Sequence, residues 1–188
     1  MDSKRLIHIS KYLSKHLRHR PDRLALELFP GGWVPVDELL AALGKNNFPV
    51  TRRELEQVVA ENDKQRFSLD QSGEMIRANQ GHSVEVDLGL EPVPPPERLY
   101  HGTARQNLAP ILQAGLARMG RHHVHLCRTP EEARKIGARR GRPVVLEIDA
   151  AGMERKGYRF FVSDNDVWLT EEVPPRLLRP LEPGGSPD

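Results

Sequence analysis

Arginine and histidine are the residue types of this chain best able to do chemistry, and they stand side by side twice. Arg18 and His19 are adjacent near the N-terminus, and Arg121 directly precedes His122–His123. Arginine binds phosphate through a planar fork of N–H groups, and histidine exchanges protons near neutral pH. Arginines also outnumber lysines by 21 to 7. These residues favour a site for a phosphate-bearing ligand, although codon bias in a GC-rich genome could also account for the arginine excess.

Other common site chemistries lack their usual residue patterns. The histidines around His125 bring no cysteine or carboxylate at ligand spacing, and the zinc motif H-E-x-x-H is absent. Cys127 is the single cysteine, which excludes an internal disulfide and a multi-cysteine metal site. A nucleophile elbow, a P-loop and a glycine-rich dinucleotide fingerprint are also missing. We therefore expect no bound metal.

The charge of the chain is almost balanced in total but not along its length. The 188 residues carry 28 basic and 26 acidic side chains, a net charge of +2, which excludes a histone-like polycation. Residues 1–23 nevertheless hold seven basic and two acidic side chains, and residues 118–142 hold eight and two. Such segments are typical of proteins that bind phosphate-bearing ligands, with two solvated helix faces as the alternative.

The hydropathy pattern indicates where in the cell the protein is expected. No apolar run approaches the ~18 residues of a membrane span, and no signal-peptide core follows the N-terminus. We expect a soluble, cytoplasmic protein without a membrane partner, and nothing in the sequence indicates an obligate dimer, so a monomer is expected.

A proline-rich segment divides the chain. Residues 91–97 include four prolines within five positions, which disfavours both a regular helix and a central strand and indicates a stiff linker. The predicted organisation is an N-terminal lobe over 1–90, this linker, a C-terminal lobe over 98–182 and a disordered tail over 183–188.

The N-terminal lobe is predicted to contain three helices and a β-hairpin. The expected elements are a helix that ends near His19 before Pro21, a helix from Asp37 to Leu43 stopped by Gly44, a helix opened by the capping box Thr51–Glu54, and strands at 67–69 and 75–78. This order is that of a winged helix. The third helix is acidic, whereas lysines and arginines, Lys15 and Arg18 among them, gather on one side of the first helix.

The C-terminal lobe alternates short strands and helices, which predicts a mixed α+β arrangement. The expected elements are a strand at 99–101 entering a turn at Gly102–Thr103, a helix from Arg105 to Ala114 with Leu112 inward and Gly115 as its stop, a strand at 123–126, a helix capped by Thr129, a strand at 144–148, and a hairpin with strands at 159–162 and 167–170.

Five short motifs resemble those of a known family when they are taken together. They are Leu17-Arg18-His19, Asn62-Asp63-Lys64-Gln65-Arg66-Phe67, Ala78-Asn79-Gln80-Gly81-His82-Ser83, His101-Gly102-Thr103 and Arg121-His122-His123-Val124-His125-Leu126. In this order they resemble the RNA 2'-phosphotransferases of the KptA type, known for tRNA splicing. Each motif alone is weak, but five in register from about residue 13 to 178 form a specific signal.

The resemblance implies a winged-helix lobe that holds RNA and a C-terminal lobe of the ADP-ribosyltransferase type. It also implies a reaction with NAD as co-substrate. An internal RNA 2'-phosphate displaces nicotinamide from NAD, and the ribose 2''-hydroxyl then attacks that phosphate. The products are RNA with a free 2'-hydroxyl and ADP-ribose 1'',2''-cyclic phosphate.

The resemblance also implies roles for individual residues. The expected catalytic residues are Arg18, His19, Arg66 and Arg121, with the three arginines drawn from both lobes to hold the 2'-phosphate. The expected NAD-binding residues are His101, Gly102, Thr103, His125 and Cys127, and the expected RNA contacts are Lys15, Gln80 and His82. Many relatives carry serine at the position of Cys127, so a hydroxyl hydrogen bond to NAD is missing there.

Two other functions stay open from the residues alone. The first is a winged-helix regulator that binds nucleic acid, and the second is an ADP-ribosyltransferase that modifies terminal phosphates of RNA or DNA. The acidic third helix and the arginines in both lobes argue against the regulator.

Overall fold

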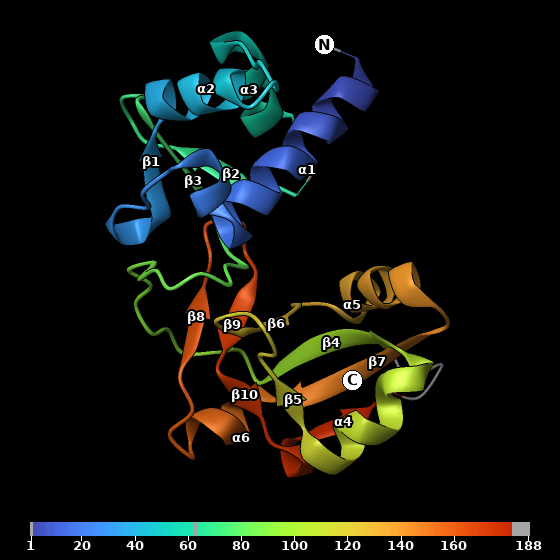
Figure 1. The fold of residues 1–188 in the computed structure, drawn as a ribbon. Helices are drawn as coiled ribbons and strands as arrows, with labels where there is room; N and C mark the ends of the chain where they lie inside the picture. Colours follow the sequence, from blue (N-terminus) through green and yellow to red (C-terminus); the bar gives the residue numbers. More distant parts are fainter. Residues whose placement is uncertain (1, 62–63, 182–188) are drawn as a thin grey trace. The chain divides into compact units, whose positions relative to one another are not determined.

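A computed structural model describes residues 2–61 and 64–181 (Figure 1). The chain has a mixed α/β fold of helices and small antiparallel sheets, and it divides into two compact units, Met1–Leu90 and Glu91–Asp188. The predicted tail at 183–188 and the motif residues Asn62 and Asp63 lie outside the described residues. None of the helices in the described ranges is long and apolar enough to cross a membrane.

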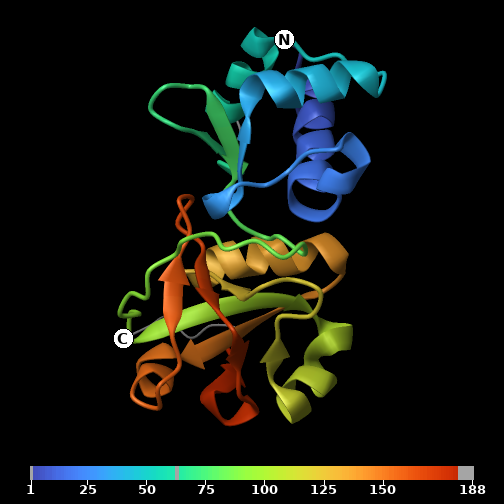
Figure 2. The ribbon, with the colours of Figure 1, turned by 60° about the vertical axis from the view of Figure 1, so that its left-hand side comes forward.

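Within its described residues, the N-terminal unit contains three α-helices and a three-stranded antiparallel sheet (Figure 2). Its elements are α1 (Ser3–His19), a 3₁₀ turn (Pro21–Leu24), a second 3₁₀ turn (Pro30–Gly32), β1 (Trp33–Pro35), α2 (Val36–Lys45), α3 (Arg52–Ala60), β2 (Phe67–Leu69) and β3 (Met75–Ala78). The strand order is β1–β3–β2, and the fully buried Ile76 on the central strand is opposite Val34 and Leu69.

Local sequence signals account for the boundaries of these helices. Asp2 caps α1 by accepting a hydrogen bond from the backbone N–H of Arg5, and the helix ends at His19 as predicted. The capping box of Thr51 and Glu54 at the start of α3 is confirmed in both of its hydrogen bonds. The hairpin β2–β3 is also confirmed, with Asp70 accepting from the N–H of Met75 across the turn.

Two features of this unit differ from the prediction. Helix α2 continues through Gly44 and ends at Lys45, because Gly44 keeps a helical backbone and glycine stops a helix only where the chain turns left-handed. Strand β1 was not predicted, because its three residues are too few to show an alternating pattern. Its pairing with β3 turns the predicted hairpin into a sheet.

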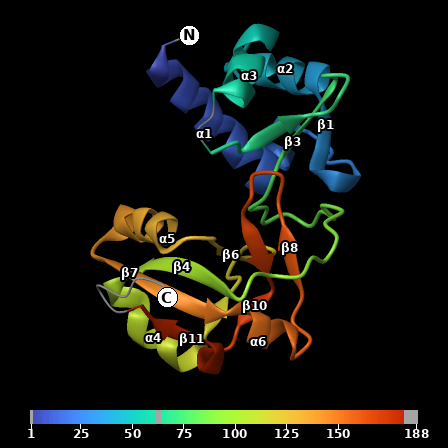
Figure 3. The same ribbon diagram turned by 180° about the vertical axis from the view of Figure 1, so that it is seen from behind.

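Up to residue 181, where the described part of the chain ends, the C-terminal unit is built from three small antiparallel sheets with short helices around them (Figure 3). Its elements are β4 (Arg98–Ala104), a 3₁₀ turn (Arg105–Asn107), α4 (Leu108–Ala114), β5 (Leu116–Ala117), β6 (Val124–Leu126), α5 (Pro130–Gly137), a 3₁₀ turn (Ala138–Arg140), β7 (Pro143–Asp149), α6 (Ala150–Glu154), β8 (Phe160–Val162), β9 (Trp168–Thr170), β10 (Glu172–Val173), a 3₁₀ turn (Pro175–Leu177) and β11 (Leu178–Pro180). The strand orders are β11–β7–β4, β6–β9–β8 and β10–β5.

The apolar core of this unit lies between its sheets. Leu99 of β4 and Ile148 of β7 face each other in the ladder, and both side chains are fully buried. They share one apolar cluster with Phe160 of β8 and Trp168 of β9. The sheet that carries β4 and the sheet that carries β9 are therefore held together by a common core.

Two predictions for the C-terminal unit are wrong. Gly102–Thr103 form no turn, because β4 continues through them and pairs residue by residue with β7 as far as Ala104. Leu112 is not directed inward, since 41% of its surface is exposed, and α4 starts only at Leu108 after a 3₁₀ turn. Gly115 does end α4 as predicted, with a φ of +83° that favours glycine.

Candidate active site

The last turn of α1 brings three of the predicted residues together within the N-terminal unit. Arg18 Nη2 donates a hydrogen bond to the backbone oxygen of Arg66 at 3.3 Å. The Arg18 guanidinium also lies over the ring of Phe67, 6.0 Å from its centroid. His19 follows directly in the chain and is exposed. The end of the first helix and the start of β2 therefore place Arg18, His19 and Arg66 in one neighbourhood, which we call the N-terminal cluster.

Asn79 connects the segment after β3 to this cluster. Its N–H donates to the oxygen of Arg66 at 2.9 Å, and its side-chain Nδ2 donates to the oxygen of Gln65 at 2.7 Å. Gln65 has a φ of +38°, a left-handed conformation that is uncommon for any residue except glycine. The buried Asn79 therefore holds a strained residue beside Arg66, and the same Arg66 oxygen also receives the Arg18 guanidinium.

Ser83 connects the same segment to the end of α1. Its N–H donates to the oxygen of Arg18 at 2.9 Å, and its Oγ lies 2.9 Å from His19 Nδ1. The motif Ala78–Ser83 thus contacts both Arg18 and His19 through main-chain and side-chain bonds. Sequence reasoning named Gln80 and His82 in this motif but gave no role to Asn79 or Ser83, although both stand in it.

The three residues expected to contact RNA differ in their exposure to solvent. Lys15 is exposed on α1, one turn before His19. Gln80 is half-buried. His82 is fully buried, and a side chain at Gly32 would come within 3.4 Å of its Nε2. His82 therefore belongs to the packed interior of the N-terminal unit, while Lys15 stands on its surface.

The C-terminal unit brings together His101, Arg121 and His125, which we call the C-terminal cluster. His101 Nδ1 lies 3.0 Å from the backbone oxygen of His125, and Arg121 Nη1 lies 3.1 Å from His125 Nδ1. A carbonyl only accepts and a guanidinium only donates, so His101 carries a proton on Nδ1, and His125 accepts on Nδ1 with its own proton on Nε2. The two histidines are therefore held in opposite tautomers.

Burial lowers the pKa of two members of this cluster, His101 and Arg121. Burial is the main cause that lowers the pKa of His101. The hydrogen bond to the His125 oxygen opposes this effect in part, and the charge of Arg121 adds a smaller lowering. His101 is therefore neutral at pH 7. Burial, followed by the charge of Arg140, also lowers the pKa of Arg121, but a guanidinium keeps its charge in proteins.

Cys127 is fixed by the backbone beside His101. Its N–H donates to the oxygen of Tyr100 at 2.7 Å, and its oxygen accepts from the N–H of Tyr100 at 2.9 Å. Burial, assisted by Glu132, raises the pKa of the Cys127 thiol to about 11. The thiol is therefore protonated at neutral pH and is a poor nucleophile.

Gly102 and Thr103 have structural roles that need no ligand. A Cβ at Gly102 would lie 1.7 Å from the backbone oxygen of Ala133 in α5, and a Cβ at Gly137 would lie 2.8 Å from the oxygen of Thr103. These two glycines allow α5 to pack directly on β4 (Figure 3). Thr103 is buried and accepts from Asn107 Nδ2 at 3.3 Å.

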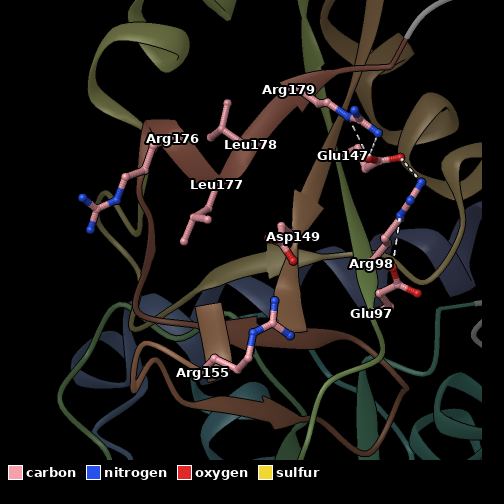
Figure 4. A pocket seen from close by; sticks show the side chains of 9 residues that line it. All are labelled: Glu97, Arg98, Glu147, Asp149, Arg155, Arg176, Leu177, Leu178 and Arg179. Atoms are coloured by element: carbon pink, nitrogen blue, oxygen red, sulfur yellow. Dashed lines mark hydrogen bonds and ion pairs between the residues drawn. The ribbon is translucent and has the colours of Figure 1, made fainter. Parts of the chain in front are cut away.

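An open pocket of about 420 Å³ lies elsewhere in the C-terminal unit (Figure 4). Its lining residues are Glu97, Arg98, Glu147, Asp149, Arg155, Arg176, Leu177, Leu178 and Arg179, and none of the predicted site residues is among them. The buried Glu147 accepts from Arg98 at 3.3 Å and from Arg179 Nε at 2.8 Å. These ion pairs neutralise much of the charge in the pocket, as expected for a structural contact between β4, β7 and β11.

Metal ligation has no support from side-chain placement. Across residues 2–61 and 64–181, no group of three or more histidine, cysteine or carboxylate side chains could hold a metal ion. The arrangement instead offers fixed guanidinium and imidazole groups, which suit the binding of phosphate and the movement of a proton.

Comparison with known proteins identifies the family. Residues 4–172 match the model of the RNA 2'-phosphotransferase, Tpt1 / KptA family. A probable RNA 2'-phosphotransferase of Nostoc punctiforme is 57% identical over 181 residues, which cover 96% of this chain and 100% of that protein. The proteins of the same name from Trichormus variabilis and Streptomyces griseus are 56% and 52% identical, and each match covers 95% of this chain and 98% of the relative. These matches confirm the resemblance, and the chain belongs to the RNA 2'-phosphotransferase, Tpt1 / KptA family.

Proposed function

We propose that this protein removes an internal 2'-phosphate from RNA, with NAD as the co-substrate. In the first step a 2'-phosphate oxygen attacks C1'' of the nicotinamide ribose, and the bond to nicotinamide breaks. In the second step the ribose 2''-hydroxyl attacks phosphorus, and the RNA 2'-oxygen leaves. The hydroxyl loses one proton and the departing oxygen gains one, so protons balance. The products are RNA with a 2'-hydroxyl, nicotinamide and ADP-ribose 1'',2''-cyclic phosphate.

This chemistry needs positioning and charge more than it needs a protein nucleophile. The 2'-phosphate is already an anion, and nicotinamide leaves from a cationic pyridinium. The two reactants are both phosphate-bearing and repel each other, so the protein must hold them in a reactive geometry. In the second step negative charge builds on the phosphoryl oxygens, which rigid guanidinium forks stabilise.

The N-terminal cluster is proposed to bind the 2'-phosphate. Arg18 and Arg66 donate to its oxygens, and His19 hydrogen-bonds it and protonates the leaving RNA 2'-oxygen. The convergence of the Arg18 guanidinium, the Arg66 backbone and His19 at the end of α1 supports these roles. Lys15, on the exposed side of the same helix, and the half-buried Gln80 are proposed to contact the RNA.

The C-terminal cluster is proposed to bind NAD and to assist at the phosphate. Arg121 is assigned to the 2'-phosphate together with Arg18 and Arg66. His101, with Nδ1–H committed to His125, offers Nε2 as an acceptor for a ribose hydroxyl of NAD. His125 contributes Nε2–H as a donor, and the protonated thiol of Cys127 replaces the serine hydroxyl of many relatives with a weaker donor. Gly102 and Thr103 shape the strand that carries His101.

The proposal extends to the fold and the cellular setting. The N-terminal unit, in which α1, α2 and α3 accompany the sheet β1–β3–β2, is assigned to the winged-helix type, and the C-terminal unit to the ADP-ribosyltransferase type. The proposed RNA is a tRNA with a splice-junction 2'-phosphate, and the protein acts as a cytoplasmic monomer. The family match over residues 4–172, which includes both clusters, is the observation that carries the proposed function.

One incubation tests the reaction. The protein is mixed with NAD and an oligoribonucleotide that carries a single internal 2'-phosphate, and the products are separated by mass spectrometry. Loss of the phosphate with release of ADP-ribose cyclic phosphate is expected. A stable ADP-ribosylated oligonucleotide would instead indicate a transferase that stops after the first step. Binding of the oligonucleotide without any consumption of NAD would indicate a binding protein and overturn the proposal.

A further inference from the structure

The hydroxyl of Ser83 stands next to the proposed acid–base residue. Its Oγ lies 2.9 Å from His19 Nδ1, while its own backbone N–H donates to the oxygen of Arg18 at 2.9 Å. The serine is thus tied by its main chain to the helix whose last residue is His19. The backbone of Ser83 is therefore held beside the imidazole that its hydroxyl contacts.

The side chain of His19 is exposed at a helix end, where an imidazole rotates about two side-chain bonds unless a partner holds it. The contact with Ser83 fixes one ring nitrogen, so it fixes the plane of the ring. The opposite nitrogen, Nε2, is then presented in one direction. In enzymes with a working histidine, a hydrogen bond to one ring nitrogen commonly sets the orientation and the tautomer of the other.

We propose that Ser83 is a positioning residue for His19, an inference that rests on the proposed function. When His19 is protonated, Nδ1–H donates to Ser83 Oγ and Nε2–H is directed at the RNA 2'-oxygen. When the Nε2 proton has moved to that oxygen, the neutral ring keeps its proton on Nδ1. Ser83 therefore accepts the same hydrogen bond before and after the transfer, and the ring does not need to turn.

The test uses variants that separate the hydroxyl from the main chain. Ser83→Ala keeps the backbone bond to Arg18 and removes only Oγ, and Ser83→Thr keeps a hydroxyl at the same position. Ser72→Ala is the matched control, because Ser72 is another exposed serine of this unit whose hydroxyl donates to Asp70 in the β2–β3 turn, away from the cluster. Equal melting temperatures for the four proteins establish that folding is intact.

For Ser83→Ala we expect kcat to fall about tenfold, less than the ~10²–10⁴-fold that a positioned acid or base contributes as a whole, while KM for the RNA and for NAD stays unchanged. Ser83→Thr retains most of kcat, and Ser72→Ala matches the unaltered protein. In a His19→Ala background the Ser83→Ala change adds no further loss, because the group that it positions is gone. A tenfold loss that persists in that background would overturn the proposal, as would full activity of Ser83→Ala.

A second readout does not depend on turnover. Two-dimensional ¹H–¹⁵N spectra of the imidazole report which ring nitrogen of His19 carries the proton. The unaltered protein is expected to hold His19 with a proton on Nδ1, and Ser83→Ala is expected to give a mixture of both tautomers. Identical spectra for the two proteins would overturn the positioning role. If the spectra change but no NAD is consumed by either protein, the proposed function fails while the contact itself stands.

Discussion

The N-terminal and C-terminal clusters hold similar side chains in different ways. Arg18 and His19 stand at a helix end. Arg18 donates to the backbone oxygen of Arg66, and Ser83 contacts both residues through its N–H and its hydroxyl. His101 lies in β4, which pairs with β7 along its whole length. Helix α5 packs on β4 so closely that glycine is needed where their backbones meet. The first cluster therefore depends on polar contacts at a helix end, whereas His101 of the second is carried by a closely packed strand, with Arg121 exposed beside it.

This contrast predicts that substitutions in the two regions affect different quantities, activity in one and the free energy of unfolding in the other. In the N-terminal cluster a side chain can be removed with small consequences for packing, so its substitutions should reduce activity and leave the fold intact. In the C-terminal unit the strand that carries His101 depends on close backbone contacts with α5, so substitutions at those contacts should reduce the free energy of unfolding first. The predictions below test this difference, beginning with the largest expected effect.

Replacement of the proposed phosphate arginines should give the largest loss of activity. For Arg18→Ala we expect kcat/KM to fall about 10²–10³-fold, since one preorganised donor at a developing charge is worth about that much. The free energy of unfolding should fall by only about 1 kcal/mol, the value of one hydrogen bond. Arg66→Ala and Arg121→Ala should show comparable losses, and lysine should restore little because it lacks the planar fork.

Arg20→Ala is the matched control for these variants. Arg20 is an exposed arginine just beyond α1 whose ion pair is with Asp22, so its loss should change kcat/KM less than about twofold. Activity is followed by release of nicotinamide, and stability by urea unfolding. If Arg18→Ala lowered stability and activity in parallel, the N-terminal cluster would be a packing site and the contrast would fail.

Gly102 should show the opposite behaviour. A Cβ at this position lies 1.7 Å from the Ala133 oxygen, so Gly102→Ala must displace the backbone of α5 from β4. We expect a loss of about 3 kcal/mol in the free energy of unfolding, at the upper end for overpacking. Gly44→Ala is the matched control, because a Cβ at Gly44 in α2 meets nothing within 4 Å and should stabilise by about 0.5–1 kcal/mol. A stable, active Gly102→Ala protein would show that β4 and α5 are not tightly packed.

The sequence predicted those parts of the fold that local rules determine. The end of α1 before Pro21, the capping box at Thr51 and the β2–β3 hairpin depend on residues close in the chain, and all three are confirmed. Gly102 shows the limit of this reasoning. A glycine beside a threonine indicated a turn, but the glycine is required by contact with α5, about thirty positions further along the chain. Such a tertiary contact leaves no periodic or turn signal in the sequence.

The candidate site follows the same pattern: its residues were predictable, but the tertiary contacts between them were not. Motif resemblance named Arg18, His19 and Arg66 without any knowledge of their geometry. It could not give the hydrogen bonds of Asn79 and Ser83, because those depend on where the segment after β3 returns to α1. It also could not show that His82 is fully buried, since histidine occurs both in protein interiors and on protein surfaces.

Cys127 offers a test of burial beside the C-terminal cluster. Because burial raises the pKa of its thiol from 9.0 to about 11, the thiolate fraction at pH 8 should be about 100-fold lower than for an ordinary cysteine. Alkylation by iodoacetamide should slow by at least that factor in the folded protein and return to the ordinary rate in urea. Since the chain has one cysteine, the mass of the labelled protein reports on this site alone. Rapid labelling of the folded protein would show that the strand next to His101 opens readily.

The smallest expected effect is the pH dependence that His101 gives to stability. Burial lowers its pKa below the ordinary 6.5, so in the folded state it stays neutral at a pH where the unfolded chain already binds a proton. Its contribution is complete above pH 6.5 and is lost as the pH falls through the folded pKa, by about 1.4 kcal/mol for each unit of difference. His101→Asn keeps a donor near Nδ1 for the His125 oxygen but does not titrate. Urea unfolding from pH 7.5 to 5 should therefore give a shallower loss of stability for the variant than for the unaltered chain. The other ionisable groups are the same in both proteins, so the difference between the two slopes isolates the contribution of His101. Equal slopes would show that its imidazole is in contact with water.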